Sequence, residues 1–248
     1  MKNFELISYA TADELARAVA GAWLDEIAAA NRAGKTHCVA LSGGRIARKF
    51  FAAVVEQAKA QKIEDGDTPA LPGNVHFFWT DERCVPPDDP ESNFHLAQEL
   101  LFGPLKIGDA QIHRIRGEDS PEAAAKAAST EISQIVPLNE ACLPILDLIF
   151  LGMGEDGHVA SLFPGEPDVL ISDKSIYRAV NNSPKPPPNR VTLGYAMITA
   201  ARQVWVLASG AGKETALRES LFSKGRTPLA RVTQFRTHTK IFSDFPLV

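Results

Sequence analysis

His158 and Asp156 form the clearest chemical pair in the sequence. They lie two residues apart in a glycine-rich turn, 152–158, that follows the apolar run 146–151. An apolar run bounded by glycine predicts a strand buried on both faces, and open α/β sheets bind their ligands at the carboxyl ends of such strands. An imidazole there can take a proton near neutral pH, and a carboxylate two residues earlier can accept from its other ring nitrogen. The pair therefore predicts an oriented general base, with a purely structural histidine as the alternative.

Two glycine patterns resemble nucleotide-binding motifs, and each lacks features that such a site needs. The turn 152–157 fits G-x-G-x-x-G, but Pro164 and Gly165 end the segment before a full helix could present its N-terminus to a pyrophosphate. The run Gly210-Ala211-Gly212-Lys213 lacks two features of a Walker A loop, because Leu207 stands where a glycine is needed and Glu214 where Ser or Thr is needed. Lys213 remains a cation between a strand's end and a helix's start.

A second strand-to-helix turn predicts an anion cradle. The turn Ser42-Gly43-Gly44-Arg45 joins an expected strand at His37–Leu41 to a helix that continues through Phe50 and Val54. Glycines let the backbone approach an anion closely, and a helix N-terminus offers free N–H groups. The guanidinium of Arg45 adds a bidentate hydrogen-bond donor. An ordinary βα turn is the alternative.

Charged residues also follow a third expected strand, 75–79. Thr80-Asp81-Glu82-Arg83 places two carboxylates and a guanidinium at the carboxyl edge of the sheet, close to the glycine turns if the sheet is parallel. The planar guanidinium of Arg83 suits phosphate geometry, whereas Asp81 and Glu82 are expected to orient neighbours. A solvated charged surface is the alternative.

The elements that must position these residues alternate between strands and helices. Thr11 and Glu14 form a capping box for a helix that runs toward Ala30, and loops are expected at 61–73 and 86–90. The proline-rich run 183–189 predicts a loop or lid that borders the site. The remaining expectations are helices that begin at Ser92 and Ser120, strands at 112–115 and 204–208, helices at 190–201 and 214–221, and two short strands within 230–248. His95 and His113 are expected to be structural. The alternation predicts a three-layer α/β fold with a mostly parallel sheet.

The length and charge of the chain favour a single domain with a small-molecule partner. Its 248 residues suit a single domain, and a net charge of −4 with no basic block disfavours nucleic-acid and membrane-surface roles. No apolar stretch is long enough to span a membrane, and the N-terminus lacks the apolar core of a signal peptide. Cys38, Cys84 and Cys142 are odd in number and widely spaced, which disfavours a disulfide framework or a zinc site and favours the cytoplasm. We expect a monomer or a small homo-oligomer.

Three segments resemble the 6-phosphogluconolactonase family. They are GMGEDGHVASLFPG at 152–165, WTDERCVPPDDPESNF at 79–94 and RVTLGYAMITAARQVWVLASGAGK at 190–213, in the family's order and over most of the chain. The resemblance implies a three-layer αβα sandwich with a Rossmann-like sheet, the fold shared with glucosamine-6-phosphate isomerases. It also implies hydrolysis of 6-phospho-D-glucono-1,5-lactone without metal or organic cofactor. Arg45, Arg83 and Lys213 would hold the phosphate, backed by Gly43 and Gly44. Arg190 would be a further substrate contact, with a surface arginine after a proline-rich loop as the alternative.

Two departures keep alternatives open. The family's turn usually continues from SGG through one variable residue to Thr-Pro or Ser-Pro, and this chain has Ile46-Ala47, which removes a hydroxyl ligand. Arg45 and Arg48 are candidates to compensate, and a non-catalytic phosphosugar-binding protein on the same fold is one alternative. The other is a sugar-phosphate isomerase or deaminase. Those relatives typically carry Asn-Glu four and five residues after the histidine, where this chain has Leu162-Phe163, which cannot move a proton.

Overall fold

The centre of the fold is a six-stranded sheet in which every pair of neighbouring strands is parallel. The computed structural model describes residues 3–60, 74–167, 173–222 and 225–247. The sheet has the order β1 (Phe4–Ser8), β9 (Thr239–Ser243), β8 (Gln203–Ala208), β5 (Leu148–Gly152), β2 (His37–Leu41) and β3 (Val75–Trp79). The predicted parallel sheet is confirmed.

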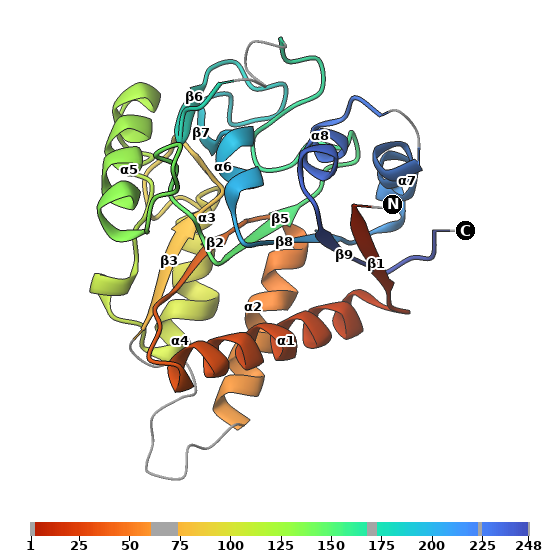
Figure 1. Ribbon diagram of the computed structural model, residues 1–248, viewed down its shortest axis with the longest axis horizontal. Helices are drawn as coiled ribbons and strands as arrows, with labels where there is room; N and C mark the ends of the chain where they lie inside the picture. The colour runs from red at the N-terminus through yellow and green to blue at the C-terminus, as the bar shows by residue number, and fades with distance from the viewer. Residues whose placement is uncertain (1–2, 61–73, 168–172, 223–224, 248) are drawn as a thin grey trace.

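Helices cover both faces of this sheet. Figure 1 shows α1 (Ala12–Arg32) and α2 (Arg45–Ala60) on one side, with α6 (Tyr195–Ala200) and α8 (Pro228–Phe235) on the other. In the part of the chain that the structure describes, the other helical segments are α3 (Asn93–Ala97), the π-helix η1 (Gln98–Phe102), α4 (Gly103–Leu105), α5 (Pro121–Ile135) and α7 (Glu214–Phe222), with short 3₁₀ turns η2 (Asp109–Gln111) and η4 (Ala211–Lys213). The α1 helix begins as predicted, because the Thr11 side chain accepts from the backbone N–H of Glu14. The three-layer αβα architecture is therefore present.

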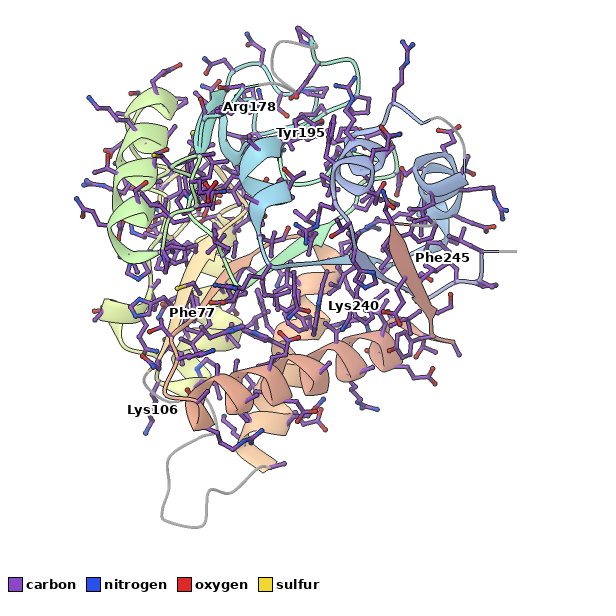
Figure 2. All side chains as sticks on the ribbon, in the orientation of Figure 1. Phe77, Lys106, Arg178, Tyr195, Lys240 and Phe245 are labelled. Atoms are coloured by element: carbon purple, nitrogen blue, oxygen red, sulfur yellow. The ribbon has the colours of Figure 1, made fainter. Side chains whose placement is uncertain are left out.

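Aromatic side chains fill the layer between the sheet and α1. The ring of Trp23 on α1 lies 5.6 Å from Phe50 and 5.2 Å from Phe150, and it meets Phe77 edge-on at 6.4 Å. Figure 2 shows Phe77 among the side chains that occupy this layer. The indole N–H of Trp23 is satisfied inside the core, since it donates to Nε2 of His37 at 3.2 Å. These contacts fix the strands whose ends carry the site.

A second, three-stranded sheet was not predicted. It has the order β4 (Asp81–Arg83), β7 (Arg190–Leu193) and β6 (Tyr177–Val180), and both pairs are antiparallel. The prediction of a helix opening at 190 is wrong, because 190–193 pair with β4 and the α6 helix begins only after Gly194. The alanine-rich helix, α5, packs on β6 and β7, so it covers this small sheet.

Two further predictions of strands are wrong. The expected strand at 112–115 reduces to a single bridge between Ile112 and Phe77. The expected pair of strands within 230–248 is instead the α8 helix followed by one strand, β9. Thr227 caps this helix by accepting from the N–H of Ala230, and Pro228 occupies its first turn, so the Thr-Pro pair was a helix start. Strands β1 and β6 were not predicted, and the predicted loop 61–73 lies outside the described residues.

The strand order creates a switch point between β2 and β5. From β2 the chain continues to β3 on one side, and from β5 it continues to β8 on the other. Because all four strands are parallel, the turns that follow them meet at one edge of the sheet, and a crevice forms where the two directions diverge. Within the described ranges, no helix is both long and apolar enough to cross a bilayer.

Candidate active site

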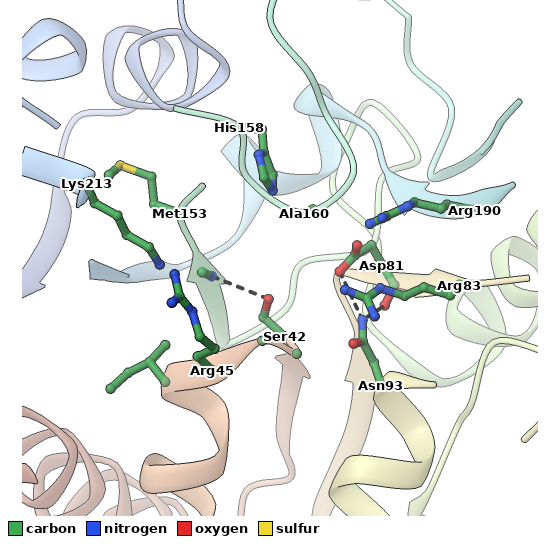
Figure 3. Close-up of a pocket in the computed structure, with 14 residues that line it drawn as sticks. Ser42, Arg45, Asp81, Arg83, Asn93, Met153, His158, Ala160, Arg190 and Lys213 are labelled. Atoms are coloured by element: carbon green, nitrogen blue, oxygen red, sulfur yellow. Dashed lines mark hydrogen bonds between the residues drawn. The ribbon is translucent and has the colours of Figure 1, made fainter. Parts of the chain in front are cut away.

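A pocket opens at this switch point, and its wall is built from turns of separate strands (Figure 3). Its lining residues are Ser42, Gly43, Gly44, Arg45, Ile46, Asp81, Arg83, Asn93, Gly152, Met153, His158, Ala160, Arg190 and Lys213. Seven of the eight residues singled out from the sequence thus line the pocket, and the eighth, Asp156, is bonded to His158. The structure brings the predicted residues together, while their roles stay predictions.

The turn after β5 holds the imidazole of His158. The N–H of Gly154 donates to the carbonyl of His158 at 2.9 Å, and Gly157 has a φ of 78°, which permits the tight reversal. A β-carbon at Gly154 would overlap the His158 ring, so glycine is required there by space. Figure 3 shows the ring directed into the pocket. The glycines seen in the sequence therefore serve to position the histidine.

Asp156 orients the imidazole and fixes its tautomer. Its Oδ1 lies 2.5 Å from Nδ1 of His158 and also accepts the backbone N–H of residue 158 at 3.2 Å. Partial burial acts to raise the pKa of Asp156, but the bonds from His158 and the Lys185 ammonium outweigh it and lower that pKa to about 2. An ionised carboxylate can only accept, so Nδ1 carries the hydrogen and Nε2 keeps a lone pair for the pocket.

The environment keeps His158 uncharged near neutral pH. Burial is the largest influence and lowers the pKa of the imidazole, Asp156 opposes it, and Lys185 lowers it further. A histidine whose pKa is lowered from 6.5 is mostly neutral at pH 7, which is the form a general base needs.

One side of the pocket gathers two cations beside the N-terminus of α2. Gly43 and Gly44 lead into the N-terminus of α2, and Gly44 has a φ of 94°. Figure 3 shows the Arg45 and Lys213 side chains converging on this side. Lys213 is only 9% exposed; burial lowers its pKa most, and the neighbouring Arg45 charge lowers it further. A buried ammonium beside a second cation and a helix N-terminus favours a bound anion such as phosphate.

The opposite side carries Asp81, Arg83, Asn93 and Arg190 (Figure 3). Asp81 is 5% exposed and accepts from the Ser161 hydroxyl at 2.6 Å and from the Asn93 amide at 3.3 Å. The resemblance implies that Arg83 holds the phosphate with Arg45 and Lys213, and Figure 3 shows Arg83 on the other side of the pocket from those two. Its positive charge acts on the guanidinium of Arg190, whose pKa is lowered mainly by burial. The pocket therefore has a pair of cations at each side.

Glu82 has a supporting position behind this wall. Its carboxylate accepts from the backbone N–H groups of Asn93 and Phe94, at 2.7 and 2.8 Å, and from the hydroxyl of Ser92 at 3.1 Å. The carboxylate thus binds the first N–H groups of α3 and fixes Asn93 at the pocket, as expected of a residue that orients neighbours.

Arg190 binds mainly to the proline-rich loop. It donates to the carbonyls of Lys185 at 3.2 Å, Pro186 at 2.8 Å and Pro187 at 3.1 Å, and to the Ser161 hydroxyl at 3.3 Å. A guanidinium has five N–H groups, so within the described residues one N–H on Nη1 is left over for a ligand. The loop 183–189 borders the site, as predicted, and Arg190 holds it there.

Sequence reasoning assigned no role to two serines at the site, although both lie in segments that it singled out. The hydroxyl of Ser42 accepts the N–H of Gly152 at 3.4 Å, and the hydroxyl of Ser161 donates to Asp81 at 2.6 Å. Ile46 and Ala47 are 5% and 4% exposed and pack into the core, while Arg48 is exposed and absent from the pocket wall. Arg45 is therefore the nearer substitute for the missing hydroxyl.

The histidines interpreted as structural lie away from the pocket wall. His113 bonds His76 and Glu131, both at 2.8 Å.

Comparisons with known proteins identify the family to which the chain belongs. A family model described as glucosamine-6-phosphate isomerases/6-phosphogluconolactonase matches residues 10–241. The chain is 34% identical to a 6-phosphogluconolactonase of Streptomyces coelicolor over 227 residues, which cover 89% of this chain and 84% of that protein. A solved 6-phosphogluconolactonase from Trypanosoma brucei superposes with a TM-score of 0.82 at 26% identity, covering 98% and 97% of the two chains.

The same fold extends to a monomeric glucosamine-6-phosphate deaminase, with a TM-score of 0.76 at 17% identity over 98% of this chain and 97% of that one. Since the family model spans residues 10–241 and the 34% identical relative is covered over 84% of its length, the chain belongs to the glucosamine-6-phosphate isomerase/6-phosphogluconolactonase family.

Proposed function

We propose that this protein hydrolyses 6-phospho-D-glucono-1,5-lactone to 6-phospho-D-gluconate, the lactonase step of the oxidative pentose phosphate pathway. The observation that carries the proposal is the position of His158. Its imidazole lies in a pocket lined by Arg45, Lys213 and the turn before α2, and its Nδ1 is bonded to Asp156, which leaves Nε2 for the substrate. The names of the curated relatives support the same reaction.

In the proposed reaction, His158 Nε2 takes a proton from a water molecule as the water oxygen attacks C1 of the lactone. The resulting imidazolium is stabilised by the Asp156 carboxylate. The tetrahedral intermediate then collapses, the bond from C1 to the ring oxygen breaks, and Nε2 returns the proton to that oxygen. The products are the open-chain acid and a neutral histidine, so the base is regenerated in one turnover.

We assign the phosphate to the corner formed by Gly43, Gly44, Arg45 and Lys213. A helix N-terminus and a buried ammonium supply N–H donors there, and hydrogen bonds to charged groups contribute about 1.5–3 kcal/mol each. The sugar and its lactone carbonyl then extend across the pocket, past the imidazole of His158, toward Arg83 and the unpaired Nη1 N–H of Arg190 among the described contacts. This arrangement uses both pairs of cations.

Isomerisation with deamination is less well supported by the site. The positions that carry Asn-Glu in those relatives are here Leu162, which is fully buried, and Phe163, whose ring lies 4.9 Å from that of His158. Neither side chain can transfer a proton, although the aromatic ring can pack against the imidazole and limit its rotation.

A non-catalytic phosphosugar sensor is the candidate from another class, and one pair of experiments separates it from the enzyme. Acid release is followed with freshly generated phosphorylated and unphosphorylated gluconolactone, corrected for spontaneous opening. Binding of 6-phosphogluconate is measured by calorimetry on the same preparation. The proposal expects rapid acid release from the phosphorylated lactone. Binding without acceleration of ring opening would identify a sensor and end the proposal.

A further inference from the structure

We propose that Lys185 is a positioning residue that sets the proton affinity of His158 from the proline-rich loop. The inference rests on the proposed function, since it concerns the base of that reaction. Lys185 belongs to the run Ser183-Pro184-Lys185-Pro186-Pro187-Pro188, far from the histidine in sequence, and its ammonium nevertheless lies beside the pair. No motif of the turn 152–158 would reveal this contact.

The contact has a defined geometry. The Nζ atom of Lys185 lies 3.2 Å from Oδ2 of Asp156 and 3.3 Å from Nδ1 of His158. The Asp156 carboxylate thus bridges two cationic or donor groups, with Oδ1 on the imidazole and Oδ2 on the ammonium. Because Nδ1 already donates to Oδ1, the ammonium bonds the carboxylate and acts on the ring by its charge.

The position of Lys185 is built into the fold. Its backbone N–H donates to the hydroxyl of Ser183 at 3.2 Å, and its carbonyl accepts from Arg190. The carbonyls of Pro186 and Pro187 accept from the same guanidinium, and proline restricts the backbone on either side. Arg190 is 4% exposed and is fixed in β7. The loop is therefore held at three successive carbonyls, and the lysine head is carried to the His158–Asp156 pair.

The charges around His158 explain how the Lys185 contact changes its proton affinity. Within the described residues, the charged groups with the largest effect on His158 are Asp156 from its own turn, Lys185 from the loop and Asp81 from β4. Both carboxylates favour the imidazolium, and the Lys185 ammonium opposes them. The ammonium therefore keeps the imidazole neutral and available as a base at lower pH than the carboxylates alone would permit.

The test measures the proton affinity of His158 directly and activity separately. The imidazole is titrated by NMR in wild type, Lys185→Met and Lys185→Arg, with its signal assigned by loss in His158→Asn. Lys185 is partly exposed, with 42% of its side chain accessible, so we expect the pKa of His158 to rise by about half to one unit in Lys185→Met. Lys185→Arg, which keeps the charge, should remain within about 0.2 unit of wild type.

The acid limb of kcat/KM should move upward by the same amount in Lys185→Met. At pH 8.5 the imidazole is mostly neutral in both wild type and Lys185→Met, so their kcat/KM values should differ by less than about threefold at that pH. A role limited to folding would lower activity at every pH. Lys126→Met, on the exposed surface of α5, removes the same charge elsewhere and should change neither quantity. Lys185→Gln replaces Lys185→Met if the latter does not fold.

An unchanged pKa of His158 in Lys185→Met or Lys185→Gln would overturn the inference. If the pKa of His158 rises while the acid limb of kcat/KM stays in place, Lys185 acts on His158 but His158 is not the base of the reaction. Failure of the Lys185 inference and failure of the proposed function therefore give different results.

Discussion

The side chain of Asn93 fills the space next to Gly43 at the pocket wall, so a β-carbon at residue 43 would overlap the carboxamide of Asn93. That carboxamide is not free to move, since it donates to the carbonyl of Asp81 at 2.9 Å. The next glycine differs: a β-carbon at Gly44 would meet no atom within 4 Å, and only its φ of 94° disfavours a side chain. The two glycines of one turn are therefore required for different reasons.

Gly43→Ala should lose stability through this overlap. We expect a loss of about 1–3 kcal/mol in the free energy of unfolding, measured in urea, because the Asn93 hydrogen bond must break or the backbone must shift. Gly44→Ala should cost roughly 1–2 kcal/mol from its backbone conformation alone.

Asn93→Ala separates the two mechanisms. Combined with Gly43→Ala it relieves the overlap, so the double variant should be more stable than the sum of the single changes by about 1 kcal/mol. Combined with Gly44→Ala it should be additive within about 0.5 kcal/mol. Additivity in both pairs would show that Asn93 does not define the space at Gly43.

Lys213→Met tests the assignment of the phosphate corner. Loss of one charged donor should lower kcat/KM for the phosphorylated lactone by about 10- to 100-fold, mostly through KM. Activity on unphosphorylated gluconolactone should change by less than threefold, which is the informative comparison.

Arg83→Met is the matched variant from the opposite wall. It should lower activity on both substrates, because we place Arg83 at the sugar end. If Lys213→Met weakens both substrates equally, or Arg83→Met affects the phosphorylated one alone, the two ends of the pocket are assigned the wrong way round.

Asp156→Asn should move the pH dependence in a direction that can be stated in advance. In wild type the pKa of His158 lies below 6.5, so kcat/KM should be level near pH 7 and fall toward acid as the imidazole is protonated. The Asp156 charge raises that pKa, so its removal should shift the acid limb to lower pH. The plateau should fall by about 10- to 1,000-fold, because the imidazolium formed during water attack loses its carboxylate. A limb that moves to higher pH would contradict this account.

Sequence reasoning succeeded where the signal is local. Glycine runs after apolar segments marked the turns that carry His158 and Arg45, and Thr11 marked the start of α1. Such signals depend on a few neighbouring residues, and a parallel sheet then brings strand ends together. The prediction that the chain is a single domain remains a prediction.

The missed features depend on distant contacts. Strands β4 and β6 have three and four residues, too few for alternation to be recognised, and they are stabilised by pairing with β7. Lys185 carries no signal in its proline-rich run, because Arg190 brings it to the imidazole through backbone carbonyls. The sequence also indicates which turns carry cations but not the wall on which each cation lies.

The central claim, that His158 moves the proton, is tested most directly by the turnover of 6-phospho-D-glucono-1,5-lactone by His158→Ala. The His158 side chain lies at the pocket, 18% exposed, and outside the hydrophobic core, so the fold and the binding of 6-phosphogluconate should persist. His95→Ala on α3 is the matched control with wild-type activity. We predict that kcat falls by roughly 10²–10⁴-fold, the usual contribution of general base catalysis. A folded His158→Ala protein that turns over within a fewfold of wild type would contradict the account.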